Sequence, residues 1–238
     1  MSSIPTVCSR FLPVLTALLI VKVTLAVVWN YRNYLPPNFN AEFLRGRESY
    51  FFDGYHLAFY AHITAGPVTL LAGLLLLSDR FRTRRPQWHR LLGRVQVTTV
   101  LLLLAPSGLW MAFYPSSGVV AGTGFAMLSL ATAFCVTLGW RSAVHRRFAE
   151  HRRWMLRTFV LLCSAVTLRL TAGLATVLEV QGEWFDPIAA WACWIVPLAI
   201  YETTTRVKHP VRSVMCRQGL VPSSASLSPA SAEIIARR

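Results

Sequence analysis

The histidines and arginines that border or interrupt long apolar runs are the reactive side chains of this sequence. The segment EHRRWMLRT, residues 150–158, places His151 among arginines just before the apolar run FVLLCSAVTLRLTAGLATVL. Arg169 lies inside that run. A charged side chain within a membrane span is costly and usually faces a bundle interior, a cavity or a partner. Arg169 is therefore a candidate site residue.

A second polar residue, His62, interrupts another apolar run. At the helical rise, His62 lies roughly 10 Å and Arg169 roughly 14 Å from the outer ends of their runs, so the two depths are compatible. We predict a buried polar site of His62 and Arg169, serving either as interhelical hydrogen-bonding groups or as a ligand or proton site. Gly66 leaves room beside His62, and Pro67 is expected to kink the helix and free a carbonyl.

His89 and His151 stand at the inner ends of their predicted helices. A b-type haem held between helices needs two imidazoles at matching depth on different helices. His89 and His151 meet this requirement, while Arg90, Arg152 and Arg153 would balance haem propionates or a lipid phosphate. These five residues are the candidate haem or lipid-headgroup site, with simple headgroup or loop contacts of the histidines as the alternative.

A second haem on the outer side is not expected. His56 and His62 share one helix, about 240° apart, and no other outer histidine is available. The sequence defines neither a metal-ligand set nor a catalytic residue, and it contains no hydrolase or phosphate-loop motif.

Helical periodicity links the two candidate sites. Arg169 follows His151 by 18 residues, which is five turns at roughly 3.6 residues per turn. In a continuous helix, His151, Thr158, Leu162, Ala165 and Arg169 would share one face. We expect that face to point into the bundle.

Composition indicates a membrane protein. Of the 238 residues, 54% are hydrophobic and 14% charged, against roughly one quarter charged in soluble domains. A bilayer core about 30 Å thick needs roughly 20 helical residues to cross it. We therefore predict an all-α polytopic membrane protein of about six transmembrane helices, with the second to fifth as a candidate four-helix core. The apolar runs are residues 11–29, 55–77, 95–114, 119–140, 158–178 and 184–203.

The net charge of +14 comes from arginines between the runs, which favours membrane topology over nucleic-acid binding. Lys and Arg are retained on the cytoplasmic side, so both termini are expected there, in a multi-pass protein of the inner (plasma) membrane. Anionic lipids on that side are the expected partners. The first run, long for a signal peptide, is read as a retained helix. The sequence identifies no oligomeric partner.

Three regions follow from this pattern. Residues 1–54 hold the first transmembrane helix and an outer loop, residues 55–205 the membrane helical bundle, and residues 206–238 a basic, then disordered, cytoplasmic tail. The five cysteines have no paired spacing and are interpreted as small apolar residues.

Three segments, HITAGPVTLLAG, WHRLLGRVQV and HRRWMLRTFVLLCSAVTLRL, resemble an uncharacterised bacterial membrane family, domain of unknown function 2306. The shared features are a helix-two histidine, a His-Arg-x-x-Gly-Arg loop, a His-Arg-x-Trp-Met-x-Arg motif and a following membrane arginine. The resemblance covers about residues 55–202 and implies a helical bundle without an assigned activity. Val68 and Thr69 stand where the family usually has a glutamine, which removes a polar group from the site.

Two hypotheses of function remain from the sequence. In the first, the protein is an integral membrane redox or cofactor-binding module with a buried His/Arg site and a haem or quinone. In the second, it is a small transporter or lipid-binding scaffold without catalytic activity. Whether it is an enzyme stays open at this point.

Overall fold

The computed structural model describes residues 8–41, 43–180 and 182–208, and these form helices without a β-strand. Within this part, five helical stretches are long and apolar enough to cross a membrane. The prediction of an all-α polytopic membrane protein is confirmed, and its apolar helices imply contact with a lipid bilayer. The stretches are Pro13–Asn33, Glu48–Leu76, Pro86–Ala112, Gly118–Val144 and Phe148–Val177.

The sixth predicted span forms a helix, α10 (Phe185–Lys208), but it is not among those five stretches. Its acidic residues Asp186 and Glu202 and its basic end dilute the apolar run that suggested a span. The predicted disordered tail lies outside the described residues.

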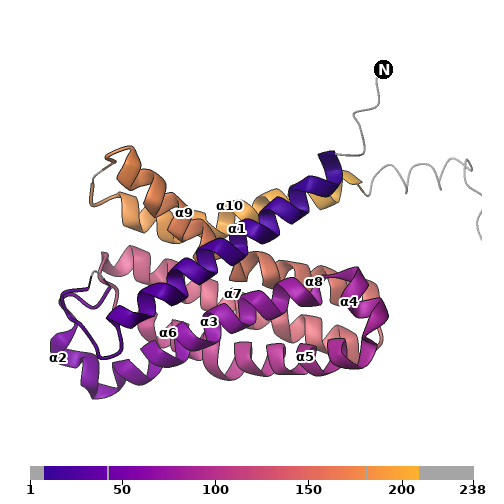
Figure 1. Ribbon diagram of the computed structural model, residues 1–238, viewed down its shortest axis with the longest axis horizontal. Helices are drawn as coiled ribbons and strands as arrows, with labels where there is room; N and C mark the ends of the chain where they lie inside the picture. The colour runs from indigo at the N-terminus through magenta and orange to yellow at the C-terminus, as the bar shows by residue number, and fades with distance from the viewer. Residues whose placement is uncertain (1–7, 42, 181, 209–238) are drawn as a thin grey trace, which may run out of the picture. The chain divides into compact units, whose positions relative to one another are not determined.

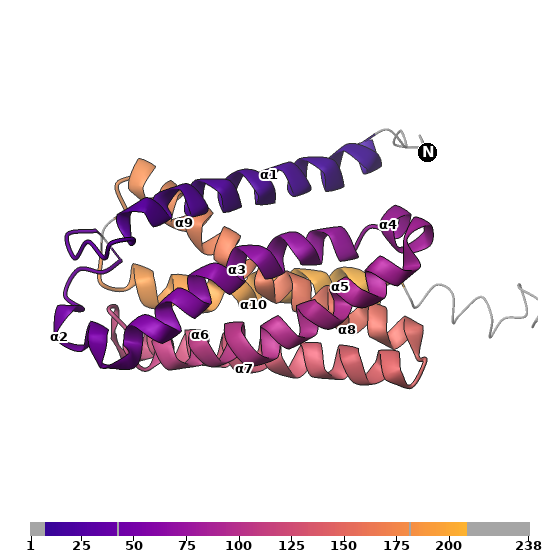
Figure 2. The ribbon, with the colours of Figure 1, turned by 60° about the horizontal axis from the view of Figure 1, so that its bottom comes forward.

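The second to fifth spans pack against one another, as the sequence predicted. They run side by side in Figures 1 and 2. Their shared core is a set of aliphatic side chains that includes Leu70, Val100, Val136 and Leu162. The four spans consist of α3 (His56–Leu76), then α5 (Pro86–Thr99) with η3 (Val100–Leu104) and α6 (Ala105–Ala112), then α7 (Gly118–Val144) and α8 (Phe148–Leu162).

Two polar contacts tie the connections together at opposite ends of the bundle. At one end, the short helix α4 (Asp79–Arg84) meets α8 through an ion pair of Asp79 Oδ2 with Arg152 Nη2 at 3.5 Å. At the other end, Ser117 Oγ donates to Asp186 Oδ2 at 2.7 Å. The loops therefore alternate between the two ends along the chain (Figure 1).

An aromatic cap forms from the end of the first span, the start of the second span and the segment that connects them. It contains η1 (Tyr31–Asn33), α2 (Glu48–Tyr50) and the wide turn η2 (Phe51–Tyr55). The Arg47 guanidinium is buried in the cap and donates to the carbonyls of Phe43 and Tyr114, each at 2.8 Å. These bonds fasten the cap to the end of α6.

The observed helix boundaries differ from two sequence-based expectations, the starts of the third and fifth helices and the continuity of the fifth. The third and fifth helices begin about ten residues before their apolar runs, at Pro86 and Phe148, so His151 lies inside α8 rather than before it. Hydropathy marks the part of a helix at lipid depth, whereas the basic first turns extend beyond it. The predicted continuous fifth helix breaks at Cys163, after which α9 (Ser164–Val177) follows. Helix α1 (Cys8–Asn30) precedes the bundle.

Candidate functional site

Two cavities lie within the bundle, in different halves. The His62 cavity has a volume of about 220 Å³ and is lined from α1, α3, α7, α8, α9 and the η3–α6 junction. The His89 cavity has a volume of about 410 Å³ and is lined from α3, α4, α5, α7 and α8. Each cavity holds polar side chains that the sequence singled out.

Neighbouring hydrogen bonds define the protonation of the His62 ring. Ser107 Oγ donates to the Leu104 carbonyl at 3.1 Å, and His62 Nδ1 lies 3.2 Å from Ser107 Oγ. Because the Ser107 proton is already used, its oxygen accepts the Nδ1–H of His62. In the neutral ring, Nε2 is then an acceptor without a proton.

The backbone near His62 has two special features. Gly108 permits close approach, since a Cβ there would lie 2.8 Å from Ser129 Oγ and 3.1 Å from His62 Cε1. The π-helical turn η3 ends just before Pro106, which has no N–H to continue the regular helical ladder. Together they bring His62 and Ser129 to the same part of the cavity.

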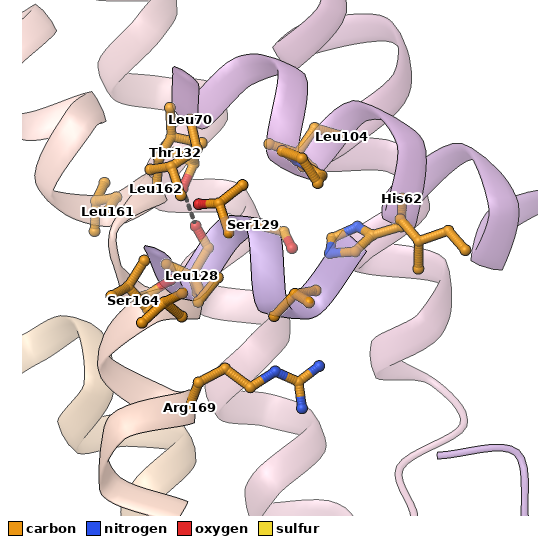
Figure 3. Close-up of a pocket in the computed structure, with 18 of the residues that line it drawn as sticks. His62, Leu70, Leu104, Leu128, Ser129, Thr132, Leu161, Leu162, Ser164 and Arg169 are labelled. Carbon is orange, nitrogen blue, oxygen red and sulfur yellow. Dashed lines mark hydrogen bonds between the residues drawn. The ribbon is translucent and has the colours of Figure 1, made fainter. Parts of the chain in front are cut away.

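Arg169 enters the same cavity from α9. His62 and Arg169 point into it from different helices (Figure 3). The Arg169 side chain is exposed, and within the described part of the chain it makes no hydrogen bond or ion pair, although it acts electrostatically on the Tyr31 hydroxyl. The structure therefore brings the two predicted residues to one cavity without a direct hydrogen bond between them.

Tyr31 also lines the His62 cavity and forms a hydrogen bond with the backbone of α3. Pro67 has no N–H, so the Ile63 carbonyl one turn earlier loses its helical donor. The Tyr31 hydroxyl donates to that carbonyl at 2.7 Å. The freed carbonyl expected from Pro67 is thus present, and Tyr31 at the start of η1 supplies its partner.

The His89 cavity brings His89 and His151 together from α5 and α8. His151 Nδ1 lies 2.8 Å from the Gly139 carbonyl, which accepts only, so Nδ1 carries the proton and Nε2 is the free acceptor in the neutral ring. The two imidazoles are close enough to interact electrostatically. Within the described residues, His89 Nδ1 is buried without a hydrogen-bond partner.

Gln96 also lines this cavity, at its apolar side. Its Nε2 donates to the Thr69 carbonyl at 2.8 Å. Its Oε1 is buried and has no hydrogen-bond partner in the described part of the chain, which leaves one open acceptor. Sequence reasoning missed Gln96, although its position as a polar residue within the apolar VQV was a usable signal.

Four arginines and one carboxylate line the rest of the cavity, namely Arg82, Arg90, Arg94, Arg152 and Asp79. Asp79 pairs with Arg82 at 3.0 Å and with Arg152 at 3.5 Å. The Arg82 hydrogen bond, followed by the charge of Arg152, holds the pKa of the Asp79 carboxyl below its ordinary value. Among the described residues, Arg90 and Arg94 have no acidic partner, so the cavity has an excess of positive charge.

The predicted haem or lipid-headgroup site differs in part from the lining of the His89 cavity. His89, His151, Arg90 and Arg152 line one cavity, whereas Arg153 does not line it. Arg82 and Arg94, which the sequence suggested only as topology signals, take part instead.

The five residues expected on one inward face, His151, Thr158, Leu162, Ala165 and Arg169, each line a cavity of the bundle, but not the same cavity. His151 and Thr158 line the His89 cavity, whereas Ala165 and Arg169 line the His62 cavity. The break at Cys163 separates the two pairs. Leu162, just before the break, lines both cavities.

The fold and the cavities define a polytopic all-α membrane protein with two polar cavities inside its helical bundle. A sequence model of the predicted membrane protein family, domain of unknown function 2306, matches residues 59–205, and the chain belongs to this family. The resemblance stated from the sequence motifs is confirmed. No curated protein and no solved structure matches the chain.

Proposed function

We propose that this protein is a membrane-embedded redox module that binds one b-type haem in the His89 cavity. The observation that carries the proposal is the meeting of His89 and His151, from two helices, in one cavity with an excess of arginines. Two imidazole ligands on different helices are what a b-type haem between helices requires. Such a group, when bound, supplies one-electron transfer.

His151 suits ligation because its ring orientation is already fixed. The Gly139 carbonyl holds Nδ1–H at 2.8 Å, which leaves Nε2 as the ligating atom. A backbone carbonyl on the far nitrogen is the usual outer partner of a ligating histidine and raises its basicity. His89 makes no hydrogen bond in the described part of the chain, so its ring needs to break none to ligate.

The other residues that line the His89 cavity suit the propionates and the apolar faces of a haem. Arg90 and Arg94 have no acidic partner in the described segments and are available for two propionates. Val97, Phe159 and Leu162 provide apolar walls. The volume of about 410 Å³ takes only part of a macrocycle, so the group would also need the space that the Asp79–Arg152 pair closes between α4 and α8. The Asp79–Arg152 pair there is exposed and weak enough to open.

A reduced-minus-oxidised spectrum of protein produced with ample haem tests this function. We expect a low-spin haem signal that His89→Gln and His151→Gln each abolish. His145→Gln is the matched control, because His145 ends α7 nearby without lining the cavity. A flat spectrum, or a signal that survives both substitutions, would refute the proposal.

A second candidate function is the binding of an anionic lipid headgroup. The unpaired Arg90 and Arg94 and the exposed mouth favour it, because a lipid phosphate needs clustered cations rather than two imidazoles. Under this alternative, phosphatidylglycerol copurifies with the wild type and is lost on replacement of Arg90 and Arg94 by Gln, while His89→Gln retains it. A scaffold or a small transporter would use the site in this way.

The proposed location is the inner (plasma) membrane, with the arginine-rich loops and both termini in the cytoplasm. The support is the charge asymmetry of the loops together with their alternation between the two ends of the bundle. The haem site would then lie at the cytoplasmic side and the His62 cavity in the outer half.

A further inference from the structure

The His62 cavity collects polar groups that lack partners at membrane depth. Ser129 and Ser164 make no hydrogen bond within the described segments, and Arg169 has no acidic partner there. Unsatisfied polar groups cost several kcal/mol each in a hydrocarbon environment, where water is scarce. A bound molecule with oxygen atoms at two places would satisfy them.

Arg169 and His62 require different hydrogen-bonding partners. Arg169 offers guanidinium donors and needs an acceptor oxygen. His62 offers its Nε2 lone pair, because Nδ1–H is held by Ser107, so it needs a donor. A carboxylate satisfies Arg169 but brings only lone pairs to His62. A ring with one acceptor oxygen and one hydroxyl satisfies both.

The walls and the volume define the body of the ligand. Val23, Leu70, Leu104 and Val166 line the cavity with aliphatic surface, which suits a flat apolar ring. The volume of about 220 Å³ corresponds to roughly seven water molecules, and the bonded atoms of a ring occupy less space each than separate waters. That is space for one six-membered ring with two oxygens, and a longer tail must leave the cavity.

Helix α1 provides an exit for such a tail. Only 11% of its membrane-spanning window is buried, although Val23, Thr24, Val27 and Tyr31 line the cavity. The cavity is therefore closed on this side by a single, lightly packed helix. An isoprenoid or alkyl tail passing beside α1 enters the lipid directly.

We infer that the His62 cavity binds the ring of a membrane quinone or quinol, with Arg169 donating to one ring oxygen and His62 Nε2 accepting from the hydroxyl of the reduced form. The inference concerns binding and does not depend on haem in the His89 cavity. It names the ligand class for the predicted site of His62 and Arg169, and the His89 cavity serves as an independent reference.

Equilibrium binding of radiolabelled decylubiquinone to the full chain in phosphatidylcholine nanodiscs tests the inference. Arg169→Gln should weaken binding roughly tenfold or more, since a hydrogen bond to a charged group contributes about 1.5–3 kcal/mol. Lys22→Gln is the matched control, because it removes a cation from a membrane span outside the cavity, and it should change affinity less than about twofold. Arg169→Lys should retain part of the affinity, which separates loss of a donor from loss of folding.

The redox state of the probe tests the role of His62. His62→Phe should weaken binding of decylubiquinol more than binding of decylubiquinone, because only the quinol donates to Nε2. His89→Gln and His151→Gln should leave both affinities unchanged, whatever their haem content. Absence of saturable binding, equal effects of Arg169→Gln and Lys22→Gln, or displacement by oleate at similar affinity would each overturn the inference; the last would assign a carboxylate amphiphile instead.

Discussion

At the residue scale, the Ile63 carbonyl loses its helical hydrogen-bond donor because of a proline, and the Tyr31 hydroxyl, distant in sequence, replaces that donor. Pro67 removes a backbone donor from α3, and Tyr31 of the first span supplies another at 2.7 Å. The free carbonyl was predictable from Pro67 alone. The partner was not, because the sequence does not say which hydroxyl reaches that depth.

This pair gives a quantitative prediction for stability. Tyr31→Phe should lower the free energy of unfolding by about 1 kcal/mol, because the Ile63 carbonyl loses its donor. In a Pro67→Ala background, residue 67 regains an N–H for that carbonyl, so Tyr31→Phe should cost less. A double-mutant cycle in detergent measures the difference. Strict additivity of the two substitutions would show that Tyr31 does not serve the carbonyl freed by Pro67.

Asp79 is the residue that restrains the arginines of the His89 cavity. Its pKa lies below the ordinary carboxyl value because of Arg82 and then Arg152. A depressed folded-state pKa means that the pairing is complete above the ordinary value and is lost only as pH falls through the lower one. Between pH 6 and 8 Asp79 is therefore ionised and pairing is constant.

We accordingly expect Asp79→Asn, and not a change from pH 6 to pH 8, to release Arg152. Mass spectrometry after phenylglyoxal treatment at neutral pH should find Arg152 modified faster in Asp79→Asn than in the wild type. The difference should shrink in 1 M salt, which screens an exposed pair. Equal rates at low salt would contradict a restraining role for Asp79.

At the element scale, the stretch formed by α8 and α9 contributes residues to both cavities. Periodicity placed His151 and Arg169 on one face of a continuous helix, and neither a proline nor a glycine at Cys163 warned of the interruption. The types and depths of the candidate residues could be predicted from hydropathy and charge. Their grouping depends on which neighbouring helices border each part of this stretch, and the pattern of one sequence does not encode that.

The close packing of α6 against α7 leads to a prediction for protein stability. A Cβ on Gly122 would lie 2.7 Å from the Ala112 carbonyl oxygen, and a backbone atom cannot move away without shifting its helix. Gly122→Ala should therefore destabilise the protein by about 1–3 kcal/mol.

Gly173 in α9 is the matched control for Gly122. A Cβ there meets nothing within 4 Å, so Gly173→Ala should be neutral or stabilising by up to about 1 kcal/mol. Thermal unfolding in detergent compares the two variants. Equal melting temperatures would contradict the close approach of α6 and α7 at Gly122.

At the scale of the whole molecule, composition and run lengths were sufficient for the class of fold and for the four-helix core. They did not indicate that α10 falls outside the five stretches long and apolar enough to cross a membrane, and they underestimated how far α5 and α8 extend beyond their apolar parts. The cavities could not be predicted, because they form where side chains fail to fill the space between helices. Gln96, Arg82 and Arg94 joined a site only through that geometry.

The proposed orientation leads to a labelling prediction. Cysteine introduced at Ser117, in the short connection between α6 and α7, should react with a membrane-impermeant maleimide from outside intact cells. Cysteine at Arg84, at the end of α4, should react only after the membrane is opened. The native cysteines are replaced by alanine in both variants. The reverse pattern would invert the topology.

Leu162 borders both cavities and belongs to the aliphatic core with Leu70, Val97 and Val166. The two cavities bring polar surface toward this layer from different halves of the bundle, so the low-dielectric thickness along their path is less than that of the bilayer. A membrane potential acts across the low-dielectric part, at about 2.3 kcal/mol per elementary charge for each 100 mV. With water in both cavities, the electric field would be concentrated across the aliphatic layer around Leu162, which would then act as the insulating part of the bundle.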